Sequence, residues 1–205
     1  MTKRLRVILI ITAIVLVSVM TTATGITVAL WDSASGGSNE YGPVVDTIDW
    51  NSWTKYFAYD AVMSGESISY YKVKSFEGTN LGDVVFPTQN NGITVSTINS
   101  SVFASTTKKE LPITIYVSGT ISTIEAAAFA NLQNLEKVVF SVSSVTANGE
   151  TSNVQSAVTV GAYCFAGCAN LKEIVIEGGR SVTFDPTAFI GCTSLTDSAY
   201  SGYTK

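Results

Sequence analysis

The sequence predicts a β-rich α/β solenoid of about four coils, each about 24 residues long, preceded by an N-terminal apolar helix. A short pattern anchored on phenylalanine recurs through the second half of the chain and predicts the coils. Hydrophobic residues make up 46% of the 205 residues and charged residues only 14%, a balance that favours strands and turns over amphipathic helices. A strongly apolar stretch near the N-terminus predicts the helix.

Residues 1–30 have the layout of a signal peptide. Basic residues come first, the strongly apolar stretch 7–20 follows, and small and hydroxylated residues come after it. This stretch would form roughly 21 Å of helix, shorter than a bilayer core of about 30 Å, which favours cleavage. A helix extended to Trp31 would instead be a membrane anchor, and a buried core helix is the least favoured alternative. With either a cleaved signal peptide or a membrane anchor, the rest of the chain is expected outside the cytoplasm. Residues 31–44 are rich in Gly and Ser and predict a flexible linker.

Residues 45–80 are expected to form an N-terminal cap, because a solenoid needs its open end covered. Its aromatic residues follow a spacing that predicts one face of a helix: Trp50, Trp53, Tyr56 and Phe57. A first strand is expected at residues 70–73. Trp50 and Trp53 are also possible ligand-binding aromatics that stack against sugar rings, although such residues more often form core.

Residues 81–205 are predicted to form the solenoid itself. Four phenylalanines occupy one place in a recurring pattern, each five residues after another apolar residue: Phe103, Phe129, Phe165 and Phe189. Three copies share a later leucine: Leu135, Leu171 and Leu195. Each copy would supply a strand with alternating inward side chains, such as Ile174 and Ile176. Stacking buries what one coil cannot, so the four rings are expected to lie above one another.

The repeat period is uneven. Successive members of the phenylalanine series are 26, 36 and 24 residues apart, which places an insert between Phe140 and Val160. The insert is polar and contains the turn signal Asn148-Gly149. We therefore expect either a surface loop or an excursion that lengthens two strands.

Three segments of the chain are variations on one phrase: AFANLQNLEKVVF, CFAGCANLKEIVIEGG and AFIGCTSLTDSAY. At these residues the sequence resembles the BspA-type leucine-rich repeats, whose unit runs as a strand, a turn, V-T-x-I, a short A-F turn of helix, G-C and L-x-x-I-x-I. The resemblance covers about residues 70–200, and it lacks Gly-Cys in the first two units. It implies a leucine-rich repeat protein of the cell surface that binds host or matrix proteins in adhesion.

Composition also disfavours several kinds of site. The chain has no histidine, the commonest general base and metal ligand, so we predict no catalytic, cofactor-binding or metal-binding residue and no enzyme. The net charge of −4 and the lack of a basic run in the body disfavour a nucleic-acid partner. Cys168 and Cys192 lie three residues after a phenylalanine in successive copies, and both are expected to be buried free thiols. A disulfide between them is the alternative.

Taken together, these features predict an exported protein, secreted or attached to the membrane by its N-terminal segment. Its expected function is recognition of an extracellular protein or glycan by an extended face. The alternative is a structural module that self-associates through its cap or through an open edge of the solenoid. A hydrolase is disfavoured by the missing histidine.

Overall fold

The computed structural model describes residues 20–22, 25–27, 48–78, 82–104, 112–147 and 150–196. The chain divides into two units, Met1–Ile48 and Asp49–Lys205. In the first unit, β1 (Met20–Thr22) and β2 (Gly25–Thr27) pair as an antiparallel hairpin. These residues form strands where the sequence allowed an apolar helix extended to Trp31, because Thr and Ile favour extended backbone. The rest of the predicted export segment and the predicted linker lie outside the described residues. Among the residues that are described, no helix is long and apolar enough to cross a membrane.

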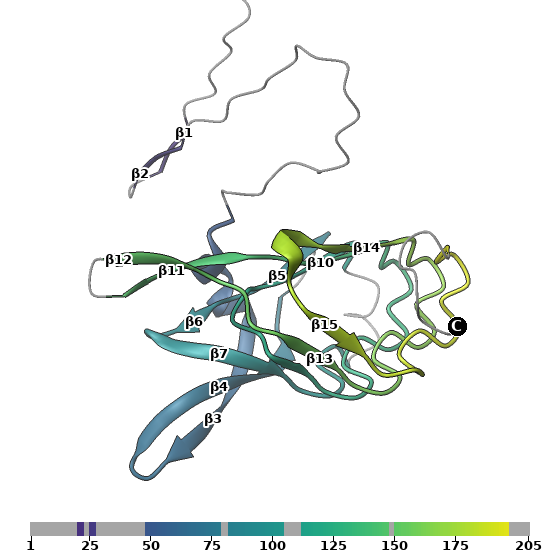
Figure 1. The fold of residues 1–205 in the computed structure, drawn as a ribbon, viewed down its shortest axis with the longest axis horizontal. Coiled ribbons are helices and arrows are strands. Elements are labelled where there is room, and N and C mark those ends of the chain that lie inside the picture. Colours follow the sequence, from purple (N-terminus) through teal and green to yellow (C-terminus); the bar gives the residue numbers. More distant parts are fainter. Residues whose placement is uncertain are drawn as a thin grey trace, which may run out of the picture. The chain divides into compact units, whose positions relative to one another are not determined.

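The second unit is built on two sheets whose inner faces share one hydrophobic core (Figure 1). The first sheet has four parallel strands in the order β14-β10-β8-β5. These strands are β5 (Asp83–Phe86), β8 (Thr114–Val117), β10 (Lys137–Phe140) and β14 (Glu173–Ile176). The pairing places equivalent repeat positions side by side: Val84, Ile115, Val138 and Ile174. Alternating apolar residues therefore form continuous inner rows along the solenoid.

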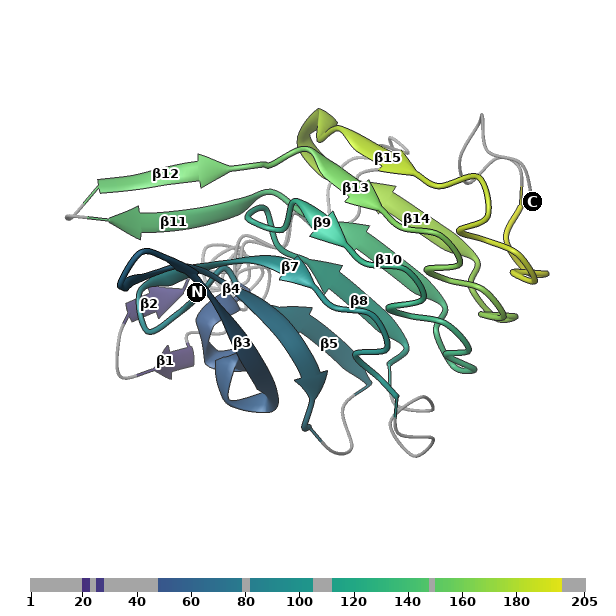
Figure 2. The ribbon, with the colours of Figure 1, turned by 90° about the horizontal axis from the view of Figure 1, so that it is seen from below.

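The second sheet runs along the opposite side of the core in the order β15-β13-β9-β7-β4-β3 (Figure 2). Its strands are β3 (Phe57–Ser64), β4 (Ser67–Phe76), β7 (Ile93–Ile98), β9 (Thr123–Ile124), β13 (Val158–Val160) and β15 (Val182–Phe184). The strands from β15 to β4 are parallel, whereas β3 is antiparallel to β4 and the short β6 (Gln89–Asn90) is antiparallel to β7. The apolar residues that precede each phenylalanine by five positions all end strands of this sheet: Ile98, Ile124, Val160 and Phe184.

A tight turn follows each of β7, β9, β13 and β15 and places one phenylalanine in the core. Successive turns are joined by main-chain hydrogen bonds, since the Phe129 N–H donates to the Cys164 carbonyl and the Phe165 N–H donates to the Ala188 carbonyl. Gly167 and Gly191 occupy one repeat position with φ of 75° and 79°, which explains the glycine of the Gly-Cys pair. Asn131 takes the same left-handed conformation in the preceding coil.

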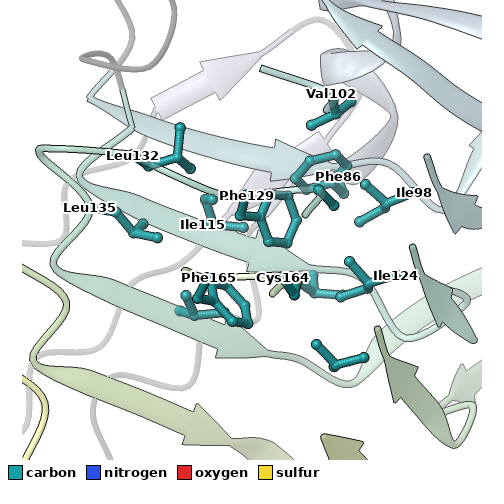
Figure 3. Close-up of a cluster of buried hydrophobic side chains, with 14 of the residues drawn as sticks. Phe86, Ile98, Val102, Ile115, Ile124, Phe129, Leu132, Leu135, Cys164 and Phe165 are labelled. Carbon is teal, nitrogen blue, oxygen red and sulfur yellow. The ribbon is translucent and has the colours of Figure 1, made fainter. Parts of the chain in front are cut away.

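The phenylalanine side chains form a continuous ladder. Neighbouring ring centroids lie 6.1 Å apart for Phe103 and Phe129, 5.4 Å for Phe129 and Phe165, and 5.3 Å for Phe165 and Phe189. Figure 3 shows Phe129 and Phe165 in successive coils, between Ile115 of the first sheet and Ile124 of the second. The ladder starts one coil earlier than the sequence indicated, because the Phe76 ring lies 5.2 Å from that of Phe103.

The N-terminal cap differs from its predicted form. A 3₁₀ helix, η1 (Trp50–Tyr56), begins after Asp49, whose side chain accepts a hydrogen bond from the Ser52 N–H. The helix ends at Tyr56, and Phe57 begins β3 instead of continuing the predicted helical face. The reason lies in packing, since the Phe57 ring contacts Phe76 at 5.3 Å and Phe86 at 5.0 Å and so links the cap to the solenoid core.

The insert forms an antiparallel hairpin of β11 (Ser143–Ala147) and β12 (Glu150–Val154). This hairpin is a separate two-stranded sheet, whereas the sequence predicted a surface loop or an excursion that lengthens two strands. The short η2 (Glu177–Gly179) forms the corresponding corner of the next coil. The prediction that both Ile174 and Ile176 are buried is wrong for one of them. Ile174 is buried, but Ile176 is 41% exposed. Ile176 pairs with Phe140 on one side only, because β14 is the last described strand of its sheet.

Candidate binding face

The repeat residues singled out by the sequence line the core. The structure buries all of them: Phe103, Phe129, Phe165, Phe189, Leu135, Leu171, Leu195, Cys168 and Cys192. Their role in the structure is packing, so any binding surface must be made by other side chains, such as those that point outward from the strands.

The three cysteines are free and buried. The Cys168 thiol donates to the Phe129 carbonyl and the Cys192 thiol to the Phe165 carbonyl, each at 3.1 Å, so each thiol is bonded to the preceding coil. Burial raises the pKa of Cys168 to about 12 and that of Cys192 to about 11. Such thiols are protonated at neutral pH and are poor nucleophiles. Among the described residues, no group of three or more potential ligands could hold a metal ion.

The two aromatic residues considered for glycan binding differ in accessibility. Trp50 is only 8% exposed, so its ring cannot stack against a sugar without rearrangement of the cap. Trp53 is half-buried and makes an edge contact with Tyr56 at 5.5 Å. Only Trp53 is open enough for a glycan, and that role stays a prediction.

The outer face of the first sheet carries two rows of side chains that alternate with those of the core cluster. One row is mainly charged: Asp83, Thr114, Lys137 and Glu173. The next row is apolar except for a phenol: Val85, Tyr116, Val139 and Val175. Val85 and Val139 are only 4% and 2% exposed, so the accessible members of this row are Tyr116 and Val175, which are both half-buried. A flat sheet face with an aromatic side chain in an apolar row is typical of a protein-binding surface.

Charges surround Tyr116 unevenly. Lys137 pairs with Glu173 at 3.0 Å, and Lys172 pairs with Glu136 at 3.0 Å. Asp83 and Glu177, by contrast, have no cationic partner in the described part of the chain. Burial, and then the negative charges of Asp83 and Glu177, raise the pKa of Tyr116. The phenol therefore stays neutral and lies in a negative field.

The outer face of the second sheet offers a contrast. A column of threonines crosses it in register: Thr97, Thr123, Thr159 and Thr183. At its N-terminal end the charges are paired, Lys72 with Glu125 at 3.2 Å and Lys74 with Asp60 at 3.1 Å. Val62 and Tyr70 pair on β3 and β4 and are half-buried, but the threonine column itself has no apolar member. We therefore take the first sheet, where Tyr116 lies in an inner strand, as the better candidate for recognition.

The sequence did not single out Tyr116, Asp83 or Glu177. Strand alternation could have assigned Tyr116 to an outer face, but nothing in the sequence marks that face as a binding surface. The sequence also gave no sign of Arg180, which is 4% exposed. Its guanidinium donates to the carbonyls of Val117, Ile121, Ser141 and Ser156. Burial lowers the pKa of Arg180 to about 10, which leaves the side chain charged at neutral pH.

A family model described as the BspA type leucine rich repeat region matches residues 72–202, more than half of the chain, in six copies. The chain belongs to the BspA-type leucine-rich repeat family. The six copies exceed the four coils that the sequence predicted. Phe76 accounts for part of this difference, because the Phe76 N–H donates to the Val102 carbonyl just as the Phe129 N–H donates to the Cys164 carbonyl.

Two solved structures are similar to this BspA-type chain. One is a leucine-rich repeat protein of T. pallidum, with 16% sequence identity and a TM-score of 0.45 over 69% of this chain and 67% of that chain. The other is a leucine-rich cell surface protein of Faecalibacterium prausnitzii A2-165, with 20% identity and a TM-score of 0.42. That match covers 62% of this chain and 30% of the other. No curated protein sequence matches the chain.

Proposed function

We propose that the protein is an exported, surface-associated binding module that recognises another protein through the outer face of its four-stranded sheet. The observation that carries this proposal is the Tyr116 side chain, half-buried in an apolar row and flanked by Asp83 and Glu177. Aromatic anchors dominate binding energy at protein interfaces, and complementary charge guides association. The partner's surface would therefore present an apolar group beside a Lys or Arg side chain.

A binding array of purified matrix and cell-surface proteins, together with glycans, tests this proposal. We expect at least one protein to bind, and Tyr116→Ala to weaken that binding at least about tenfold, a loss of about 1.4 kcal/mol. The matched control is Thr159→Ala on the second sheet, which should change binding less than about twofold. Equal effects of the two substitutions, or silence across the proteins, would rule out this face.

A glycan-binding role is the second candidate, and the accessibility of Trp53 is its only support. Binding to glycans alone, lost in Trp53→Ala and retained in Tyr116→Ala, would favour it. Family membership supports a binding scaffold over an enzyme. Adhesion to host or matrix proteins is the finer form of the same proposal.

Export is proposed from the sequence alone. Basic residues before an apolar stretch in residues 1–30 support secretion or membrane anchoring, and residues 31–44 would then join the body to the membrane. N-terminal sequencing of the protein recovered from cells and medium separates these outcomes. A new N-terminus close to residue 30 means cleavage, whereas an intact Met1 in the membrane fraction means an anchor. An intact Met1 in the cytoplasm would contradict export.

A further inference from the structure

The β11–β12 hairpin is held firmly at its root. Arg180 donates to the Ser141 carbonyl at 3.0 Å and to the Ser156 carbonyl at 2.9 Å, which lie on either side of the hairpin. The same guanidinium also bonds the Val117 and Ile121 carbonyls of the preceding coil. Because one buried cation joins the ends of the insert to the neighbouring coil, the hairpin leaves the solenoid in a defined direction.

Close backbone packing adds to this anchor. The Gly119 N–H donates to Ser143 Oγ at 2.7 Å, and the Ser156 N–H donates to the Gly119 carbonyl at 2.7 Å. A Cβ at position 119 would overlap the Val154 carbonyl oxygen, so only glycine fits there. The root is therefore part of the packed body, unlike an ordinary surface loop.

Beyond its root, the described side chains of the hairpin contribute nothing to the hydrophobic core. None of its described side chains belongs to the buried core cluster. On β12 the side chains from Glu150 to Asn153 are all exposed. Figures 1 and 2 both show the hairpin extending away from the stacked coils. A rigid element that the core does not need is suited to contact with another molecule.

The hairpin also lacks the features that normally protect an edge strand. Its five residue pairs run without a register shift, and residues 143–154 contain no Lys, Arg or Pro. The edge strand β3 is different, since two register shifts interrupt its pairing with β4. Natural proteins use bulges, Lys and Pro to prevent strand addition at edges, so their absence from β11 and β12 leaves these strands open to pairing.

We propose that β12 pairs antiparallel with β12 of a second copy of the chain, across a two-fold axis at Ser152. In this register Ser152 lies opposite Ser152, and Glu150 lies opposite Val154. No like charges then face each other, because Glu150 is the one charged residue of the strand. This inference goes beyond the proposed function, since it uses a surface separate from the Tyr116 face.

The contact would be weak and concentration-dependent. A ladder of five residues per copy buries far less than the roughly 800 Å² per partner of a standard stable interface. Copies displayed together on one surface would nevertheless associate, because a high local concentration replaces intrinsic affinity.

A charge-swap experiment on the full chain tests the pairing. Ser152→Lys and Ser152→Glu each place like charges opposite each other at the two-fold axis and should raise the dimer Kd at least about tenfold in sedimentation equilibrium. An equimolar mixture of the two variants should associate at least as strongly as the unmodified chain. Ser69→Lys, at an exposed position of β4, is the control and should leave association unchanged.

Three results would overturn the proposal: an unmodified chain that stays monomeric up to millimolar concentration, Ser152→Lys and Ser152→Glu variants that each associate as well as the unmodified chain, or a mixture that fails to restore association. Ser152 is exposed, so circular dichroism should show unchanged folding in both variants. Tyr116→Ala leaves this association intact, so failure of the pairing and failure of the Tyr116 face are separate results.

Discussion

Two antiparallel hairpins of the second unit, β3–β4 and β11–β12, have opposite relations to the core. The β3–β4 hairpin places Phe57, Val73 and Phe76 in the core and joins the parallel sheet through β7. The β11–β12 hairpin places no described side chain in the core cluster and forms a two-stranded sheet of its own. Strand-forming residues are common to both. What separates them is whether alternate side chains are large and apolar, as in β3–β4, or small and polar, as in β11–β12.

The two hairpins are also held by different forces. Burial of aromatic surface fixes β3–β4, whereas hydrogen bonds from one buried guanidinium fix the root of β11–β12. A hydrophobic anchor makes a hairpin part of the cooperative fold. A polar anchor at the root holds the direction of a hairpin but leaves its strands outside that fold.

The largest effect is expected from a substitution in the cap, which tests the hydrophobic anchor of the β3–β4 hairpin. Phe57→Ala removes a ring that contacts Phe76 and Phe86, and it should lower the free energy of unfolding by about 3–5 kcal/mol. Urea unfolding followed by circular dichroism measures the loss. Met63→Ala, on the same strand but 54% exposed, is the control and should cost less than about 0.5 kcal/mol. Similar losses for both variants would mean that the cap is not anchored through its aromatic core.

The next test acts on the root of the second hairpin. Arg180→Met leaves buried main-chain carbonyls without a donor, so we expect a loss of at least about 3 kcal/mol in the same urea experiment. Arg180→Lys keeps the charge but lacks the planar set of donors, and its loss should be smaller. Hydrogen exchange in Arg180→Met should accelerate first in β11 and β12. Unchanged protection of these strands would contradict the anchoring role.

Alkaline pH gives a smaller effect that reports on the solenoid alone. Cys168 and Cys192 ionise in the unfolded chain at the ordinary thiol pKa of 9.0, whereas burial raises their folded pKa to about 12 and about 11. The folded state therefore keeps protons that the unfolded state releases, and stability falls as pH rises between about 9 and 11. Each thiol should contribute on the order of 1 kcal/mol per pH unit.

Urea titrations at pH 8, 9 and 10 measure this slope. The double variant Cys168→Ala, Cys192→Ala should lose part of it, and a slope unchanged in that variant would assign the effect to other groups. Removing the β11–β12 hairpin should leave the slope unchanged, because no cysteine lies in it.

The solenoid could be predicted from sequence because its signal is repeated. One phenylalanine per coil, always five residues after another apolar residue, indicated the ladder from Phe103 to Phe189. Phe76 fits the same rule through Tyr71, but a phenol is a weaker apolar signal. The sequence therefore indicated only an incomplete unit there, at Leu81, Val84 and Phe86, without Phe76. In the cap, the spacing from Trp50 to Tyr56 fits a helix, and only tertiary packing makes Phe57 begin a strand.

The candidate binding face could not be predicted from the sequence for a different reason. Outer residues such as Tyr116 are under no repeat constraint, so a single sequence cannot separate them from ordinary solvated surface. The role of Arg180 is even harder to predict from the sequence. Its partners are main-chain carbonyls of other coils, and these leave no trace in residue types.

Excision of the second hairpin tests most directly the claim that it serves association and not folding. Residues 144–153 are replaced by Asn-Gly, a two-residue connection that can join the paired residues Ser143 and Val154. The Arg180 contacts to Ser141 and Ser156 are kept. Urea unfolding and sedimentation equilibrium are then measured on the same samples.

We expect a free energy of unfolding within about 1 kcal/mol of that of the intact chain, together with the loss of self-association. A shortened chain that fails to fold, or one that associates as strongly as the intact chain, would contradict this expectation.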